Sequence, residues 1–183
     1  MALTYTPAPV IGQPCPQFSL PGVDGNTYSL ESFAAAKVLA IMFLCNHCPY
    51  VKAVEQRLLD LARELQPMGV GFVAICANDA TRYPQDSFAN LRRNWLEKHY
   101  PFPYLHDAEQ IVAHRFAAVC TPDFFVYDEV RKLAYRGRLD DNWQEPDKVQ
   151  QQEMRRAILE ILAGQPVSGE QIPSMGCSIK WID

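Results

Sequence analysis

Blocks of apolar and polar positions along the chain predict strands and helices in alternation. Residues 38–44 form a continuous apolar run, which is typical of a strand buried on both faces. Apolar residues then recur at helical spacing, with charged residues between them, at Val51, Val54, Leu58, Leu61 and Leu65. Pro49 suits the first turn of this helix, and Gly69 suits its end. The pattern predicts a buried strand that leads directly into an amphipathic helix.

The rest of the chain continues the alternation. We expect strands over residues 70–77 and 102–105, helices over 84–98, 108–117 and 149–163, and an antiparallel pair over 123–128 and 132–138. The side chains expected to face the core in the second and third helices are Phe88, Leu91, Trp95, Leu96, Ile111, Val112 and Phe116. Strands that alternate with helices and end in an antiparallel pair predict a mixed α/β sheet with helices on both faces.

The two ends of the chain have patterns of their own. Residues 4–16 carry four prolines and predict an extended lead-in. Residues 18–20 and 27–30 flank an Asp24-Gly25 turn, which predicts a β-hairpin at the N-terminal side of the fold. The segment after Pro173 reads as a short C-terminal tail.

Length and composition narrow the class of protein. A chain of 183 residues fits one domain, which we expect to span residues 1–183, and 48% hydrophobic residues can form a substantial core. The net charge of −4 without a basic stripe argues against a nucleic-acid partner. The longest apolar run is too short to cross a membrane, and no secretory signal is visible. We therefore expect a cytoplasmic protein, either a monomer or a homodimer.

Six cysteines are unevenly spaced along the chain. Cys45 and Cys48 form one close pair, and the scattered singles are Cys15, Cys76, Cys120 and Cys177. In a reducing compartment a single cysteine is usually a small buried hydrophobe. The close pair instead lies where the predicted strand over 38–44 ends and a helix begins. Only this pair combines close spacing with a position typical of reactive groups.

A helix N-terminus favours the thiolate form of a cysteine. Unpaired backbone N–H groups and the positive end of the helix dipole meet there, and the thiolate is the nucleophile. A separation of two residues lets one sulfur attack while the other waits behind it. We therefore expect Cys45 to attack a target disulfide and Cys48 to resolve the mixed disulfide. His47 lies between them, either facing the sulfurs and stabilising the Cys45 thiolate or remaining exposed with little effect.

Half of a zinc site is the alternative interpretation of the pair. Structural zinc takes four ligands, usually from two close pairs, and no second close pair is present. We expect neither a metal nor a cofactor. Cys120 and Cys177 are possible additional thiols: Cys120 is expected to be buried, and Cys177 either packs beside Trp181 or folds back as a resolving thiol. Thr121-Pro122 leads into a strand, where a cis bond would offer the Thr121 backbone to an extended partner.

Several motifs occur in the order found in one known family. They are Pro16-x-Phe18-x-Leu20, Asp24-Gly25, Tyr28-Ser29-Leu30, Cys45-x-x-Cys48 and Val119-x-Thr121-Pro122-x-Phe124-Phe125-Val126-Tyr127-Asp128. From about residue 10 to the C-terminus the chain resembles the redoxin branch of the thioredoxin superfamily, which includes alkyl-hydroperoxide-reductase and thiol-specific-antioxidant proteins. Within it, the chain is similar to a peroxiredoxin-like subgroup with a Cys-x-x-Cys motif. The resemblance implies the thioredoxin-like fold, a cis Pro122, Thr121 facing Cys45, and Cys45 as the exposed nucleophile.

The chain departs from both branches of that superfamily. Where peroxiredoxins have Pro-x-x-x-Thr-x-x-Cys, Ile41 and Cys45 take the places of proline and threonine. Where thioredoxins have a buried acid before the first cysteine, the chain has Leu39. We expect a thiol–disulfide oxidoreductase that acts on protein or small-molecule disulfides with a separate electron donor. The alternatives are an antioxidant thiol peroxidase and a non-catalytic redox-sensing or metal-binding module.

Overall fold

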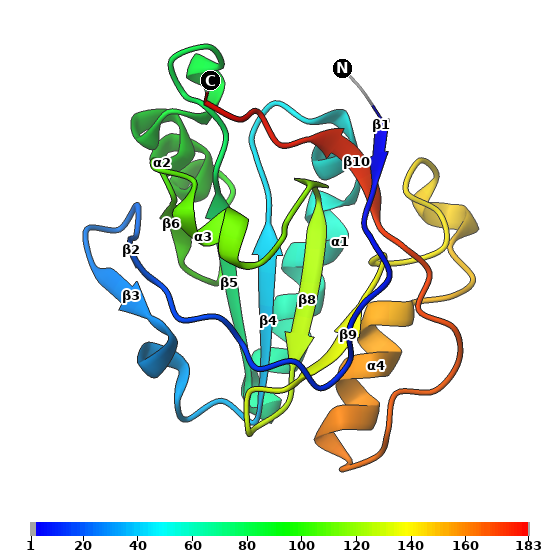
Figure 1. Cartoon of the computed structure of the whole chain (residues 1–183). Helices are drawn as coiled ribbons and strands as arrows, with labels where there is room; N and C mark the ends of the chain where they lie inside the picture. The colour runs from blue at the N-terminus through cyan, green and yellow to red at the C-terminus, as the bar shows by residue number, and fades with distance from the viewer. Residues whose placement is uncertain (1–2, 183) are drawn as a thin grey trace.

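The structure is a computed structural model that describes residues 3–182, and a mixed sheet lies at its centre (Figure 1). The strands follow the order β6-β5-β4-β8-β9. Their bounds are β4 Val38–Phe43, β5 Val70–Cys76, β6 Tyr104–His106, β8 Asp123–Tyr127 and β9 Leu133–Arg136. β4 is parallel to β5 and antiparallel to β8, β5 is parallel to β6, and β8 is antiparallel to β9. The predicted mixed sheet and its antiparallel pair are confirmed.

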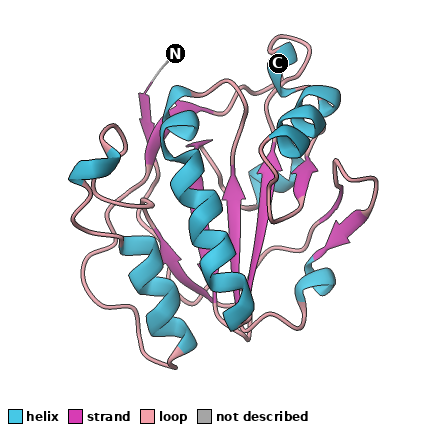
Figure 2. Cartoon of the chain, turned by 180° about the vertical axis from the view of Figure 1, so that it is seen from behind, coloured by secondary structure: helices cyan, strands magenta, loops and turns pink. Residues whose placement is uncertain are grey.

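Alternate side chains of β4 enter two separate cores. Its even-numbered side chains face one core, its odd-numbered side chains face the other, and all of them are wholly buried. The first core is completed by α1, α2 and α4, and the second by α3 and the hairpin strands β2 and β3. Figure 1 shows α3 on the near side of the sheet, and Figure 2 shows α1 and α4 covering the opposite side. Truncation of one such side chain, as in Met42→Ala, costs about 2–5 kcal/mol. The carboxyl end of β4 is therefore rigidly placed.

Helices, a hairpin and 3₁₀ turns surround the sheet. Their bounds are α1 Pro49–Leu65, α2 Phe88–Glu97, α3 Ile111–Arg115, α4 Glu153–Leu162, β2 Ser19–Pro21 and β3 Thr27–Ser29, with the 3₁₀ turns η1 Leu30–Phe33, η2 Gln66–Met68, η3 Pro84–Asp86 and η4 Pro146–Lys148. The predicted hairpin is confirmed by the antiparallel pairing of β2 with β3. Gly69 ends the turn after α1 with a φ of 91°, a left-handed conformation that favours glycine. None of the described helices is both long and apolar enough to cross a membrane.

The two ends of the chain form a second sheet that the sequence did not predict. β1 (Leu3–Tyr5), β10 (Met175–Ser178) and β7 (Cys120–Thr121) pair antiparallel in the order β1-β10-β7. The expected extended lead-in and C-terminal tail therefore both contribute strands. These strands are short and pair with partners more than 50 residues away, so neither periodicity nor a local turn marks them in the sequence. Their pairing brings the C-terminus onto the edge of Thr121.

Two of the predicted helices are shorter than expected, and some residues at their ends face outward. The predicted helix over 84–98 divides into η3 and α2, because Ser87 between them has an extended backbone with φ −62° and ψ 152°. Leu91 is buried as expected, but Phe88, Leu96 and Ile111 are 37%, 51% and 46% exposed. Trp95, Val112 and Phe116 pack against the cores as expected. The exposed residues lie at the ends of α2 and α3, where the extended Ser87 and the short length of α3 limit the helical face.

Candidate active site

The close pair of cysteines lies in the short connection from β4 to α1. Cys45 follows the end of β4 by two residues, and Cys48 is the residue that caps the N-terminus of α1. Pro49 takes the first helical position, where its missing N–H leaves nothing unsatisfied, and the Cys48 carbonyl accepts the N–H of Lys52 at 3.0 Å. The two side chains are 2% and 0% exposed. The expectation that Cys45 is exposed is therefore wrong, because the loop packs both thiols beneath the surface.

The loop between β7 and β8 lies against the pair. The Thr121-Pro122 bond is cis, as the resemblance implied. Thr121 Oγ1 lies 3.2 Å from Cys45 Sγ, and the thiol form of Cys48 donates to the Thr121 carbonyl at 3.1 Å. One residue thus contacts both sulfurs, one through its side chain and the other through its backbone. The prediction that Thr121 faces Cys45 is confirmed.

The two thiols divide one proton unequally. A hydrogen bond from the Cys45 thiol is the main cause of a pKa of about 5 at Cys48. Hydrogen bonds with Cys177 and the Val51 N–H lower this pKa further, and burial raises it. Burial, the hydrogen bond to Cys48 and the charge of Asp86 hold the pKa of Cys45 well above its usual value. The pKa of Cys48 is therefore lowered and that of Cys45 raised, while the sequence led us to expect the lowered pKa on Cys45.

His47 faces the sulfur side of the loop, which was one of the two positions that the sequence left open. Its Nδ1 atom lies 2.6 Å from Asp86 Oδ2, and its ring stacks on Tyr83 with a centroid distance of 5.1 Å. A ring nitrogen of His47, a carboxylate oxygen of Asp86 and Cys45 Sγ all lie within 4.8 Å of one another. The Nε2 atom is buried and has no hydrogen-bond partner among residues 3–182. The ring is therefore held beside Cys45 with one nitrogen uncommitted.

Asp86 is the site residue that the sequence did not reveal. It is wholly buried in η3, where it accepts hydrogen bonds from the Asn46 backbone at 2.7 Å and from the Asn78 side chain at 2.8 Å. Burial alone would raise the pKa of this carboxyl, but the hydrogen bonds from His47, Asn78 and Asn46 outweigh it and lower the pKa. In the sequence, Asp86 falls in the first turn of a predicted helix, where acids are common because they interact favourably with the helix dipole. Only the fold places it beside the thiols.

Cys45, His47 and Asp86 are also the residues that offer ligand atoms to a metal ion. Three ligands are one fewer than a closed zinc site requires. The short contact between His47 Nδ1 and Asp86 Oδ2 already satisfies one ligand atom of each side chain. The arrangement is therefore better suited to proton transfer beside a thiol than to holding a structural metal.

Cys177 belongs to the same cluster. It lies on β10 directly opposite Thr121, is 2% exposed, and its thiol is hydrogen-bonded to Cys48. The expected packing beside Trp181 is wrong, because Trp181 stacks on His114 at 4.2 Å against the other core. Of the two interpretations that the sequence left open, the structure thus gives the position of a thiol that folds back to the pair. Strand pairing, which local sequence does not show, is what brings it there.

The other cysteines are buried, and Cys15 and Cys120 have hydrogen-bond partners outside the pair. The Cys120 thiol donates to the Pro122 carbonyl at 3.6 Å, and burial raises its pKa. Cys76 is wholly buried on β5, and burial raises the pKa of Cys15 to about 12. These three behave as the buried small hydrophobes that the sequence predicted.

Comparison with known proteins agrees with this geometry. The chain is 44% identical to an uncharacterized conserved protein from Geobacillus kaustophilus, whose solved structure matches with a TM-score of 0.94 over 100% of this chain and 97% of that one. A hypothetical protein from Sinorhizobium meliloti matches at 35% identity, with a TM-score of 0.92 over 98% of both chains. No curated protein matches the sequence significantly.

More distant structures show the fold. A thiol:disulfide interchange protein of the thioredoxin family from Chlorobium tepidum matches with a TM-score of 0.65 at 16% identity, over 85% of this chain and 99% of that one. The central sheet, the cis-proline loop and the helices on both faces are thus those of a thioredoxin-like fold. The model of the AhpC/TSA family matches residues 11–136, which include Cys45, Cys48 and Thr121. The chain therefore belongs to the AhpC/TSA family of thioredoxin-like redox proteins.

Proposed function

We propose that this protein is a thiol–disulfide oxidoreductase that cycles Cys45 and Cys48 between a dithiol and a disulfide. The observation that carries the proposal is the position of both sulfurs against the cis-proline loop, with Cys45 Sγ 3.2 Å from Thr121 Oγ1 and Cys48 Sγ 3.1 Å from the Thr121 carbonyl oxygen. Two cysteines separated by two residues at a helix start can close a disulfide. A thiolate at neutral pH is also the reactive species in disulfide exchange. The fold and the family support a redox function for this pair.

The proposed cycle begins at Cys45, which lies beside the loop that contains His47. As Cys45 passes its proton to the Cys48 thiolate, its sulfur attacks the substrate disulfide and releases one substrate thiolate. That thiolate takes the proton from Cys48, directly or through His47. Cys48 then attacks Cys45 Sγ, which closes the Cys45–Cys48 disulfide and releases the second substrate thiolate. A separate thiol donor returns the pair to the dithiol.

The substitution Cys45→Ser tests this proposal. We expect it to abolish turnover in the reduction of insulin disulfides or of a small-molecule disulfide, because no sulfur remains at the attacking position. Cys15→Ser is the matched control, since Cys15 is a buried thiol in the other core, and this variant should retain wild-type turnover. Unaltered turnover in the Cys45→Ser variant would contradict the proposal.

A thiol peroxidase is the second candidate, and one observation favours it. The Cys48 thiolate faces the Val51 N–H at the start of α1, which is a suitable setting for attack on a peroxide. The nearby buried arginine, however, is already engaged: Arg136 binds the carboxylate of Asp123 at 2.8 and 3.2 Å. We therefore expect slow peroxide consumption. Stopped-flow kinetics that give a rate far above that of free cysteine would favour the peroxidase instead.

The metal-binding alternative rests on the Cys45, His47 and Asp86 cluster. We expect protein purified without chelator to contain no stoichiometric zinc or copper, because Nδ1 of His47 and one oxygen of Asp86 satisfy each other. Metal analysis would decide between the two roles, and a tightly bound ion would favour binding over catalysis.

A further inference from the structure

We propose that Cys177 is a third redox thiol, which takes over the disulfide from the close pair to form a Cys48–Cys177 bond. The inference rests on the proposed dithiol cycle of Cys45 and Cys48. Three sulfurs gather around Thr121: Cys48 Sγ lies 3.1 Å from its carbonyl oxygen, Cys45 Sγ lies 3.2 Å from its Oγ1, and Cys177 is paired opposite it on β10. Hydrogen bonds of Cys48 with both Cys45 and Cys177 lower the pKa of Cys48. A central sulfur with two sulfur neighbours can exchange one for the other, whereas a simple two-cysteine cycle uses only one of them.

The position of Cys177 is determined by backbone pairing on both edges of β10. On one edge Cys177 is opposite Thr121, and the Ile179 N–H donates to the Val119 carbonyl at 3.0 Å. On the other edge Cys177 is opposite Leu3 of β1. Both partners are backbone elements, so the thiol does not depend on a flexible side chain for its place.

A glycine allows β10 to approach the cis-proline loop this closely. A Cβ atom added to Gly176 would lie 2.0 Å from the Thr121 carbonyl oxygen and 2.6 Å from its carbon. No side chain fits at that distance without movement of the backbone. Ser174 Oγ adds a hydrogen bond to the Pro122 carbonyl at 2.8 Å. Gly176 thus allows β10 to approach Thr121 closely enough to bring Cys177 next to Cys48.

β10 also lies where an extended partner was expected. The sequence predicted that the backbone of Thr121 would pair with an extended segment of a partner, because cis-proline loops present such an edge. In the structure a strand of the same chain pairs with it, in the manner of strand addition to a sheet edge. Cys177 therefore takes the place of a partner's cysteine and becomes the internal partner of Cys48.

The proposed step conserves atoms and electrons. Cys177 Sγ attacks Cys48 Sγ of the Cys45–Cys48 disulfide, the Cys48–Cys177 bond forms, and the Cys45–Cys48 bond breaks. The electron pair of the broken bond leaves on Cys45 Sγ, and the proton of Cys177 ends on Cys45. No oxidant is consumed, because one disulfide replaces another. Cys45 is returned as a thiol that can react with a second substrate while the first disulfide is held on β10.

The charges around Cys177 favour its attack after, rather than before, the Cys45–Cys48 disulfide has formed. Burial, followed by the hydrogen bond with Cys48 and the charge of Cys48, raises the pKa of Cys177 to about 12, while Lys180 opposes them. Oxidation of the pair removes the Cys48 charge and leaves the Lys180 charge in place. Cys177 is therefore easier to deprotonate after the Cys45–Cys48 bond has formed than before it.

Disulfide mapping of single and double variants tests the proposal. After oxidation with diamide, Cys45→Ser should lose two thiols and give the Cys48–Cys177 peptide, and Cys177→Ser should give the Cys45–Cys48 peptide. The double variant Cys45→Ser/Cys177→Ser should form no intramolecular disulfide. Cys120→Ser, a buried neighbour across from Ser178 on β10, should give the wild-type map. In the wild-type protein, equilibration with glutathione should yield both disulfides.

The outcomes separate this inference from the proposed function. If Cys177→Ser forms the Cys45–Cys48 bond but Cys45→Ser forms no Cys48–Cys177 bond, the inference is wrong and the dithiol cycle stands. If Cys177→Ser forms no bond at all, the dithiol cycle itself fails. Circular dichroism checks that each variant folds, and a wild-type map with only the Cys45–Cys48 bond also overturns the inference. Gly176→Ala provides a second probe. We expect this variant to form a smaller fraction of the Cys48–Cys177 disulfide and the same fraction of the Cys45–Cys48 disulfide when Cys177 is unavailable.

Discussion

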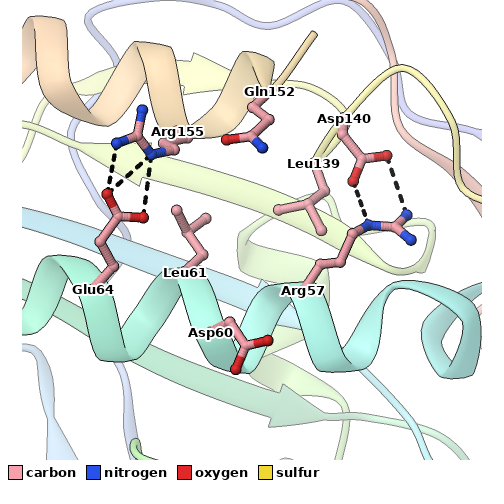
Figure 3. A pocket seen from close by; sticks show the side chains of 8 residues that line it. All are labelled: Arg57, Asp60, Leu61, Glu64, Leu139, Asp140, Gln152 and Arg155. Atoms are coloured by element: carbon pink, nitrogen blue, oxygen red, sulfur yellow. Dashed lines mark hydrogen bonds and ion pairs between the residues drawn. The ribbon is translucent and has the colours of Figure 1, made fainter. Parts of the chain in front are cut away.

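The start of α1 and its outer flank are both rich in polar side chains, but they hold their charges in different ways. Figure 3 shows the flank, where a pocket between α1 and α4 is lined by paired charges. Arg57 binds Asp140 at 2.7 and 3.2 Å, and Arg155 binds Glu64 at 2.6 Å. At the start of α1, by contrast, the buried thiol of Cys45 lies beside a histidine with an uncommitted nitrogen.

The difference shows which of the two regions is suited to chemistry. On the flank Arg57 and Arg155 each already bind a carboxylate. The pair of Arg155 and Glu64 is partly exposed, and such a pair contributes about 0–1 kcal/mol to stability. At the start of α1 the groups are shielded from water. A change of charge there has a large free-energy cost and strongly shifts the pKa of neighbouring groups. A pocket on the surface is therefore a weaker indication of function here than a closed cluster of thiols.

Removal of the thiolate should give the largest effect. We expect reduced wild-type protein to show a thiolate absorbance that appears as the pH rises through about 5, and we expect Cys48→Ala to lose it, because Cys48 carries the charge of the pair. Ultraviolet absorbance against pH measures this titration. A wild-type titration near the ordinary value of 9.0, or one that persists in Cys48→Ala, would contradict the assignment of the charge.

The same lowered pKa makes the stability of the reduced protein depend on pH. Because the pKa of Cys48 is lower in the folded chain than in the unfolded chain, its contribution is fully present above the ordinary value of 9.0 and is lost as the pH falls to about 5. The free energy of unfolding of wild type relative to Cys48→Ala should therefore rise with pH between these values. Urea denaturation at several pH values measures it.

Replacement of the buried acid should have an intermediate effect. Asp86→Asn removes a negative charge that raises the pKa of Cys45, so we expect the pH profile of disulfide reduction to shift to lower pH. It also weakens the hydrogen bonds of Asn46, His47 and Asn78, which costs about 1–3 kcal/mol in the free energy of unfolding. A merely structural role predicts the loss of stability without the shifted profile.

Asp79→Asn is the matched control for Asp86. Asp79 is also buried, but its carboxylate caps the local turn by accepting the Thr81 N–H at 2.9 Å. We expect this variant to lose some stability and to keep the wild-type pH profile. An identical shift of the pH profile in both variants would show that loss of either buried acid produces the effect, and that Asp86 has no special role.

Breaking an ion pair on the flank should give the smallest effect. Glu64→Gln removes the partner of Arg155, and both side chains are partly exposed. We expect a change of about 0–1 kcal/mol in the free energy of unfolding and no change in turnover or in the disulfide map. A large loss of turnover in this variant would mean that the pocket of Figure 3 takes part in the reaction.

Prediction from sequence was most successful where the signal was local. The apolar run over 38–44 corresponds to β4, and the helix after Pro49 ends before Gly69 as expected. It was least successful where a short element depends on distant contacts. The extended Ser87 divides one predicted helix, and α3 turns Ile111 outward, because packing rather than periodicity decides the orientation of such short helices.

The candidate site shows the same division. Spacing and position in the chain identified Cys45, Cys48 and Thr121, since a strand end, a helix start and a proline are all visible in the sequence. Asp86 was missed because it is separated by 38 residues from the pair it adjoins and carries no motif. The lowered pKa of Cys48 also depends in part on the three-dimensional arrangement, because one of the hydrogen bonds that lower it comes from Cys177 on β10.

The sequence by itself determined that two thiols stand between a buried strand and a helix, and that a threonine and a proline introduce a later strand. Local backbone preference and hydrophobic periodicity are sufficient for that, because each acts over a few residues. Only the tertiary structure decided that Cys177 joins them, that Asp86 orients His47, and that both thiols are covered. Those contacts join residues that are far apart in the chain, and the pairing of β10 with β7 brings Cys177 within reach of Cys48.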